Sequence, residues 1–199
     1  MNNLKLALSS LATAATLALP LSAVADTTPW ALDPTHSRVG FEISHMVIST
    51  VSGRFKEVTA DVKLDEENLA KSSVSVTVQA KSIDTDEPKR DDHLRSPEFF
   101  DVAKFPTITF ASSSIKAAGG EKYKLSGDLS IHGISKPVTL DATISKAVKN
   151  PWGKMVRGVK LTGKIKRSDF GLTWNKALET GGLVVGDEVK LVIQAEVNK

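Results

Sequence analysis

The feature that most constrains the fold is an alternation of apolar and polar residues with a period of two, repeated along the chain. Val39, Phe41 and Ile43 alternate with polar or small neighbours, and later segments repeat this pattern. Such alternation is typical of β-strands that bury one face and expose the other. It predicts eight strands, near residues 39–43, 58–64, 74–78, 108–110, 125–131, 138–144, 159–165 and 189–197.

Strands of this kind either stack as a sandwich or close into a barrel. Gly53, Gly127 and Gly163 lie inside strand patterns, where a glycine weakens the strand and often marks sharp curvature. Because curvature suits closure, we predict an all-β fold, an extended eight-stranded antiparallel barrel with one short helix near one end. Phe55 and Val58 differ in parity, which predicts a bulge or bend between them.

The apolar face of the predicted strands contains no Asp, Glu or Lys. Ionisable residues of that parity occur only where strands end, at His45, Arg157 and Arg167. A reaction that needs a buried general acid and base would need such groups on the inward face. A barrel of about eight strands either fills its interior with side chains or holds one small ligand. The interior therefore suits an apolar guest or ordinary core packing.

Residues 82–110 form the one long segment that does not read as simple strands. A short helix is predicted between Glu87 and Arg95, followed by the pair Phe99 and Phe100. Charged heads beside large apolar side chains suggest the rim of a cavity, with the helix closing one end of the barrel. Acidic residues at the start of the helix, such as Asp91, are interpreted as solvated helix-end charges.

Two tryptophans lie outside the predicted strands, in segments that resemble loops. Trp152 and Trp174 either gate an opening of the barrel or pack at its ends.

The remaining motifs give no sign of a metal centre or of a known catalytic signature. The four histidines, His36, His45, His93 and His132, lack the spacing of a ligand pair on a helix or strand, so they are interpreted as separate rim or surface residues. The chain has no cysteine, which excludes thiolate ligands and Cys nucleophiles. Nucleotide-binding glycine loops and the serine-hydrolase elbow are also absent from the sequence. We predict no metal site and no catalytic residue.

Residues 1–25 have the pattern of a cleavable export signal. Lys5 gives a positive start, residues 6–21 are mostly apolar, and Ala23-Val24-Ala25 forms a small-residue cleavage site. The apolar run is too short and too rich in Ser, Thr and Ala for a transmembrane anchor. We expect a mature, soluble domain of residues 26–199 in the periplasm. Its small positive charge, +3 for the full chain, does not indicate a nucleic-acid partner.

A series of short motifs runs in order along nearly the whole predicted mature chain. It includes Phe41-Glu42-Ile43-Ser44-His45, Arg90-Asp91 with His93-Leu94-Arg95, His132-Gly133, and Arg167-Ser168-Asp169-Phe170-Gly171. In this combination the chain resembles the YceI family of exported, lipocalin-like polyisoprenoid-binding proteins. The resemblance implies a periplasmic barrel with a long apolar cavity for a prenyl lipid or prenylated quinone. It also implies no known catalytic step.

From the inward face and the resemblance together, we expect a carrier, reservoir or stress-related binding protein for an isoprenoid lipid. The bound lipid is the expected ligand, and no other cofactor is predicted. Residues expected to contact the ligand comprise an apolar set lining the cavity and a basic set at its rim. They are Phe41, Ile43, Phe55, Phe99, Phe100, Phe110, Leu129, Ile131 and Phe170 for the cavity, and His45, Arg90, His93 and Arg167 for the rim and head group.

Two other classes of function remain open from the sequence. One is an enzyme that modifies an isoprenoid head group at a rim site formed by Arg90, Asp91 and His93. The other is an interaction module whose strand edges or loops contact a membrane redox protein. The sequence also leaves open whether the protein is a monomer or a dimer.

Overall fold

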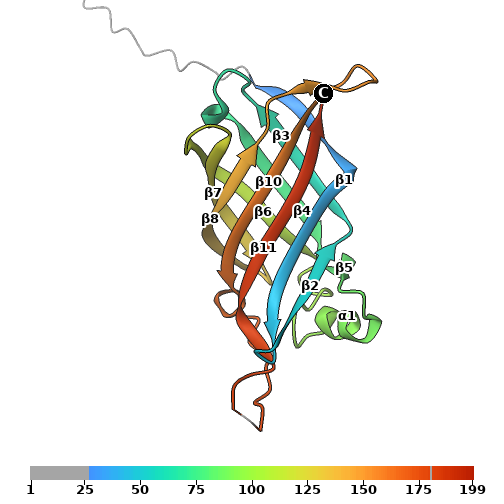
Figure 1. Ribbon diagram of the computed structural model, residues 1–199. Coiled ribbons are helices and arrows are strands. Elements are labelled where there is room, and N and C mark those ends of the chain that lie inside the picture. The colour runs from blue at the N-terminus through green and yellow to red at the C-terminus, as the bar shows by residue number, and fades with distance from the viewer. Residues whose placement is uncertain (1–26, 180) are drawn as a thin grey trace, which may run out of the picture.

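Eight long antiparallel strands close on themselves to form a barrel in the computed structural model (Figure 1). The structure describes residues 27–179 and 181–199, so the predicted export signal at 1–25 lies outside the described residues. The alternation pattern correctly located all eight barrel strands. The barrel strands are β1 (Thr28–His45), β3 (Val58–Leu64), β4 (Ser73–Gln79), β6 (Thr107–Ala117), β7 (Lys122–Ile131), β8 (Ile134–Ile144), β10 (Met155–Lys166) and β11 (Val185–Asn198).

The first and last strands close the barrel. β1 pairs with β11 from Ala31 opposite Asn198 to His45 opposite Val185. This pairing joins the first and last strands of the barrel, so the predicted barrel is confirmed and the sandwich alternative is wrong. Among the described residues, no helix has the length and the hydropathy needed to cross a membrane.

The bend predicted between Phe55 and Val58 is present. β2 (Ser49–Phe55) and β3 both pair with β1, with Phe55 opposite Val39 and Val62 opposite Trp30. The chain leaves one ladder and joins the other across Lys56 and Glu57. A short strand, β5 (Ile83–Asp84), adds to the outer edge of β2.

The predicted helix is α1 (Pro88–Arg95). It was expected to close one end of the barrel, but it lies elsewhere. The Glu87 side chain accepts a hydrogen bond from the Lys89 N–H, and Pro88 occupies the first turn, where its missing N–H costs nothing. The helix lies beside the barrel, next to β2 and β5, near the end that carries the β1–β2 turn (Figure 1). The minor elements are η1 (Leu69–Lys71), η2 (Ala80–Ser82), η3 (Arg167–Phe170) and β9 (Val148–Lys149).

The glycines within the strands make room for inward-facing side chains. A Cβ at Gly53 would lie 2.4 Å from Cζ of Phe41, its cross-strand partner. A Cβ at Gly127 would lie 2.5 Å from Cζ of Phe110. The rings of both phenylalanines therefore lie against bare backbone on the barrel wall, which is a more specific role than the curvature expected from the sequence.

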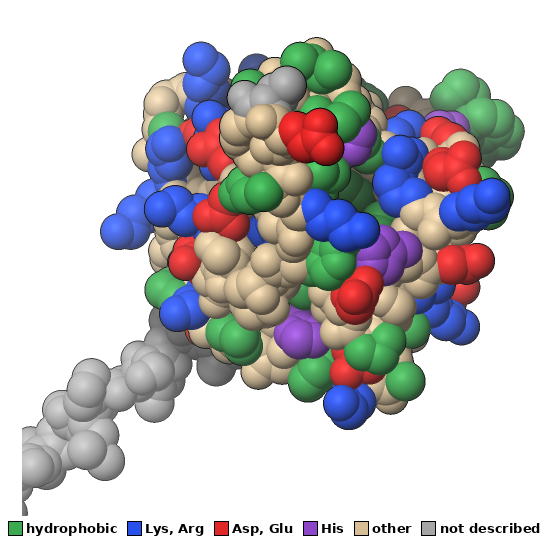
Figure 2. Space-filling view, turned by 90° about the horizontal axis from the view of Figure 1, so that it is seen from below, with side chains coloured by type: hydrophobic (Ala, Val, Ile, Leu, Met, Phe, Trp, Pro, Cys, Tyr) green, Lys and Arg blue, Asp and Glu red, His purple; other side chains and the backbone are tan. Residues whose placement is uncertain are grey.

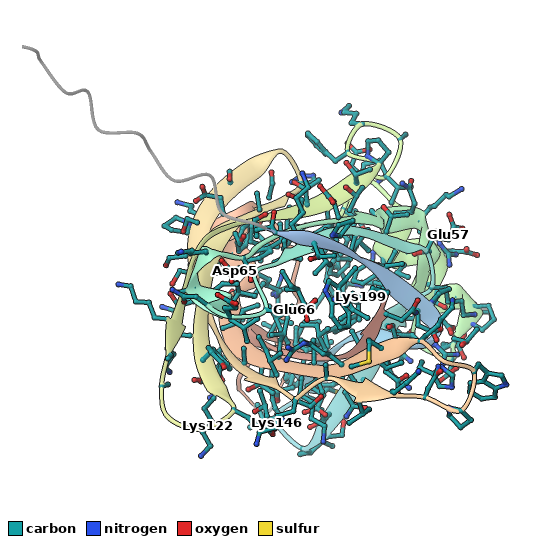
Figure 3. The ribbon with its side chains drawn as sticks, turned by 90° about the horizontal axis from the view of Figure 1, so that it is seen from above. Glu57, Asp65, Glu66, Lys122, Lys146 and Lys199 are labelled. Carbon is teal, nitrogen blue, oxygen red and sulfur yellow. The ribbon has the colours of Figure 1, made fainter. Side chains whose placement is uncertain are left out.

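Trp30 fills the end of the barrel at which the chain terminates. The side chain is buried, and the charged ends of Arg157 and Lys199 lie 5.6 and 5.3 Å from the centre of its ring. Lys199 also forms a salt bridge with Glu66. Seen from above, Glu66 and Lys199 lie over the middle of the barrel (Figure 3). We call this the closed end.

Candidate ligand-binding cavity

The barrel encloses an apolar cavity of about 480 Å³. This volume falls within the range of roughly 300–1,000 Å³ that is usual for small-molecule sites. All eight barrel strands contribute to its lining, from Leu64 near the closed end to Trp174 at the other end. At this second end the surface is hollowed, and hydrophobic side chains lie inside the hollow (Figure 2). We call this second end the mouth.

The structure brings together all thirteen residues that the sequence singled out, because every one of them lines the cavity. That they contact a ligand stays a prediction. Sequence reasoning missed Lys56 and Thr85 as lining residues and left Trp174 undecided. The apolar positions change from odd to even residue numbers between Phe55 and Val58. This change was the one sequence signal that could have placed Lys56 on the inner face.

Aromatic rings line the mouth in two connected groups. Phe99 packs against Trp174 and His93, with ring centres 5.1 and 5.0 Å away. The backbone N–H groups of Phe99 and Phe100 donate to the carbonyls of Ser96 and Leu94, which fixes this segment after α1. The second group is a chain of rings in which Phe55 lies 6.0 Å from Phe41 and 5.9 Å from Phe100.

Every ionisable residue that lines the cavity is of the basic type, and no Asp or Glu of the described residues lines it. Four of the five have hydrogen-bond or salt-bridge partners among the described residues. Lys56 forms a 2.9 Å salt bridge with Asp84, and Arg90 donates to the hydroxyl and the carbonyl of Thr85. The bond from Lys56, helped by one from Arg54, lowers the pKa of Asp84 to about 2. The five residues are His45, Lys56, Arg90, His93 and Arg167.

Arg167 is a buried cation that makes no salt bridge with any described carboxylate. Its guanidinium donates to the backbone carbonyls of Gly186 and Leu172. Burial lowers the pKa of Arg167, although the nearby charge of Asp187 opposes the shift. Asp187 itself accepts bonds from the N–H and hydroxyl of Ser168. A buried guanidinium held only by neutral acceptors suits a ligand group that is anionic or a strong acceptor.

The residues of the alternative rim enzyme do not converge on one point. Asp91 lies in the first turn of α1, as expected, but it is buried and accepts hydrogen bonds from the N–H and hydroxyl of Thr85, so the expectation that it is solvated is wrong. Its position on the inner side of α1 explains the difference, because that side faces the loop before the helix. His93 is instead bonded to Glu98. Asp91 therefore does not orient His93 as a base.

One group of residues has the composition of a metal site. Asp33, His36 and Glu196 offer ligand atoms that all lie within 4.8 Å of one another on the outer surface. The direct hydrogen bond between Asp33 and His36 (3.0 Å) raises the pKa of His36 and lowers that of Asp33. The ion pair accounts for the group, and such exposed clusters are common without an ion. The absence of a metal site stays a prediction.

The two tryptophans in loops differ in their roles. Trp174 lines the mouth of the cavity and lies under the ammonium of Lys176, 5.9 Å from its ring centre. Trp152 lies in the turn between β9 and β10, where its side chain is almost fully exposed. Neither role expected for Trp152 is correct, because its side chain is 84% exposed and the turn extends away from the barrel wall (Figure 1).

A closed antiparallel barrel of eight strands around an apolar cavity defines a lipocalin-like barrel. The YceI-like domain matches residues 30–197. The chain belongs to the YceI family, and the resemblance seen in its motifs is confirmed.

Known relatives share most of this length. Protein YceI of Salmonella newport (strain SL254) is 39% identical over 161 residues, which make up 81% of this chain and 81% of the relative. The crystal structure of Burkholderia cenocepacia BcnA has a TM-score of 0.73 at 28% identity, covering 83% of this chain and 98% of BcnA. A polyisoprenoid binding domain from Saccharophagus degradans has the same fold, with a TM-score of 0.59 at 16% identity over 84% of this chain and 97% of that one.

Proposed function

We propose that the protein binds an isoprenoid lipid, a polyprenyl chain or a prenylated quinone, and acts as its carrier or reservoir in the periplasm. The observation that carries the proposal is an apolar cavity with no acidic lining residue among those described. The similarity in fold to a polyisoprenoid binding domain supports the same ligand class.

The tail of such a lipid matches the cavity wall in chemistry. Each buried CH₂ group contributes roughly 0.8 kcal/mol of transfer free energy, so a prenyl tail needs no charged anchor. Ordering a flexible tail offsets much of this gain. Because these two terms oppose each other, the net binding free energy is moderate, and the lipid can be released as a carrier requires.

The head group belongs at the mouth in this proposal. Arg167 and Arg90 line the cavity, as do the paired rings of Phe99 and Trp174. Guanidinium groups favour phosphate or carbonyl oxygens, and aromatic rings favour a flat ring such as a quinone. This combination supports a prenyl phosphate or a prenylated quinone over an unsubstituted hydrocarbon.

Native mass spectrometry and lipid extraction of the purified protein test the proposal directly. We expect a prenyl compound to co-purify, or to be taken up when added. Protein that carries no lipid and takes up none of a series of polyprenyl alcohols, phosphates and quinones would contradict the proposal.

Phe41→Asp is expected to weaken uptake of a prenyl compound by at least roughly tenfold, because it places a carboxylate where the tail would lie. Thr143→Asp is the matched control, since Thr143 is exposed on β8 between Lys122 and Lys160. Uptake is measured by quenching of tryptophan fluorescence, and thermal unfolding shows whether both variants are folded. A folded Phe41→Asp protein with normal uptake would remove Phe41 from the ligand site.

A further inference from the structure

Three large apolar side chains are exposed together at the mouth end of the barrel. Val47 and Ile48, in the turn between β1 and β2, are 78% and 82% exposed, and Leu183 is 52% exposed. Leu183 belongs to the hairpin whose described residues are 176–179 and 181–184, which lies beside that turn (Figure 1). We call Val47, Ile48 and Leu183 the apolar tip.

Direct contacts hold the two loops of the apolar tip together. The N–H of Met46 donates to the carbonyl of Val184 at 2.8 Å. A Cβ at Gly182 would lie 3.7 Å from Cγ2 of Val47. The two loops that carry the three exposed side chains therefore lie side by side.

The backbone of the β1–β2 turn is unfavourable for the residues it contains. Met46 and Val47 have φ values of 50° and 65°, and the N–H of Ile48 donates to the carbonyl of His45. Two central residues with positive φ define the hairpin turn for which Asn and Gly are strongly preferred. A β-branched residue in this conformation is a rare exception. Because the Val47 side chain is 78% exposed, its burial does not offset this strain, which points to a function for an exposed apolar side chain here.

The apolar tip is continuous with the cavity. His45 and Val184 line the cavity; Met46, Val47 and Ile48 are the three residues after His45, and Leu183 directly precedes Val184. At the opposite end, Trp30 and the Glu66–Lys199 salt bridge cover the barrel. An apolar ligand therefore has its direct route through the end that carries the tip.

The charges of the tip hairpin balance. Residues 176–184 carry one cation, Lys176, and one anion, Glu179, and both are exposed. Electrostatic attraction to an acidic partner is therefore weak here. The main favourable interaction of this surface is burial of its apolar side chains in a neutral, apolar medium.

We propose that the apolar tip inserts into the surface of a lipid bilayer and places the mouth of the cavity against it. This inference rests on the proposed function, since a prenyl lipid in an aqueous compartment has to be collected from or delivered to a membrane. Shallow insertion of three apolar side chains gives reversible contact, which suits a protein that docks, exchanges its ligand and leaves.

Co-sedimentation with phosphatidylcholine vesicles tests the docking itself. The variant is Val47→Asn with Ile48→Ser, in which asparagine suits the turn and preserves the fold. The matched control is Val148→Ser with Trp152→Ser, which removes apolar side chains that are 61% and 84% exposed at the closed end. All proteins are compared in the same N-terminal form, and thermal unfolding verifies their folding.

We expect the wild type and the control to sediment with vesicles, and the tip variant to partition roughly tenfold less. Equal sedimentation of wild type and tip variant, or no sedimentation of the wild type, would overturn the proposal. Loss of sedimentation in the control alone would show that the closed end docks instead, which also overturns it.

A second measurement separates docking from ligand binding. A benzoquinone with a tail of two isoprene units is supplied from solution or from vesicles, and quenching of Trp174 is followed against a Trp174→Phe protein. The tip variant should take up the quinone from solution like the wild type and from vesicles roughly tenfold more slowly. Equal rates from vesicles would contradict the inference and leave the proposed function intact. If the wild type takes up no quinone from either source, the proposed function is wrong. The sedimentation experiment then tests membrane docking by itself.

Discussion

At the scale of single residues, the shape of the cavity depends on side chains that are absent as well as on those present. The ring of Phe41 lies over Gly53 on the neighbouring strand, at a distance that leaves no room for a methyl group. The ring therefore stays against the wall and the volume beside it stays open. Gly53, which lowers the strand propensity of β2, therefore keeps part of the cavity open.

Gly53→Ala is expected to force the ring of Phe41 into the cavity. Overpacking of this kind costs about 1–3 kcal/mol of stability, and ligand uptake should fall with it. Gly158→Ala is the control, because the nearest atom to a Cβ there is Oγ of Ser145 at 3.8 Å. Unfolding in guanidinium and uptake of a prenyl compound are measured for both. Unchanged uptake by Gly53→Ala would mean that the ligand does not pass Phe41.

At the scale of elements, one carboxylate joins the β2–β3 bend to the short strand β5. Asp84 in β5 accepts bonds from Arg54 in β2 and pairs with Lys56 in the bend, at 3.0 and 2.9 Å. The three charges fix the bend at the point where Lys56 reaches the cavity wall. The β1–β2 turn, by contrast, is held in a strained conformation beside the mouth.

The pKa of Asp84, lowered from 3.8 to about 2 by Lys56 and Arg54, predicts a pH dependence of stability. A carboxyl whose pKa is lower in the folded than in the unfolded state stabilises the fold above its unfolded pKa. This contribution should be complete above about pH 4 and should be lost as the pH falls through about 2. The difference in unfolding free energy between wild type and Asp84→Asn should therefore shrink from pH 5 to pH 2. A difference that stays constant over this range would contradict the assignment.

At the scale of the whole molecule, the two ends of the barrel differ. One end is filled by Trp30, with Arg157 and Lys199 against its ring, and the other leads into the cavity. Nε1 of Trp30 is buried without a hydrogen-bond partner among the described residues, so the indole contributes by packing and not by a hydrogen bond. In the proposed function, the ligand therefore enters and leaves the barrel through the other end.

Trp30→Ala is expected to destabilise the protein by about 3–5 kcal/mol, because it leaves a large void at the closed end. Trp30→Phe should cost much less, since it keeps most of the packing and removes a donor that has no partner. Guanidinium unfolding measures both. Trp30→Ala and Trp30→Phe proteins of equal stability would show that this end is not held by the aromatic ring.

The sequence by itself determined the strands, the bend after Phe55, the helix after Glu87 and the apolar inward face. These features follow from local patterns, because a period of two decides which side chains share a face of a strand. The same parity placed Phe41, Phe110 and Leu129 together on the cavity wall. The motifs along the chain also identified the YceI family, which the comparison with its domain confirms.

Only the tertiary structure decided whether the interior is filled or hollow, since that depends on how strands distant in sequence are spaced around the barrel. It also decided that Asp91 is buried against Thr85, that α1 lies beside the barrel, and that Trp30 closes one end while Val47 is exposed at the other. Local periodicity specifies the direction of a side chain, but its neighbours come from strands that meet only when the barrel closes.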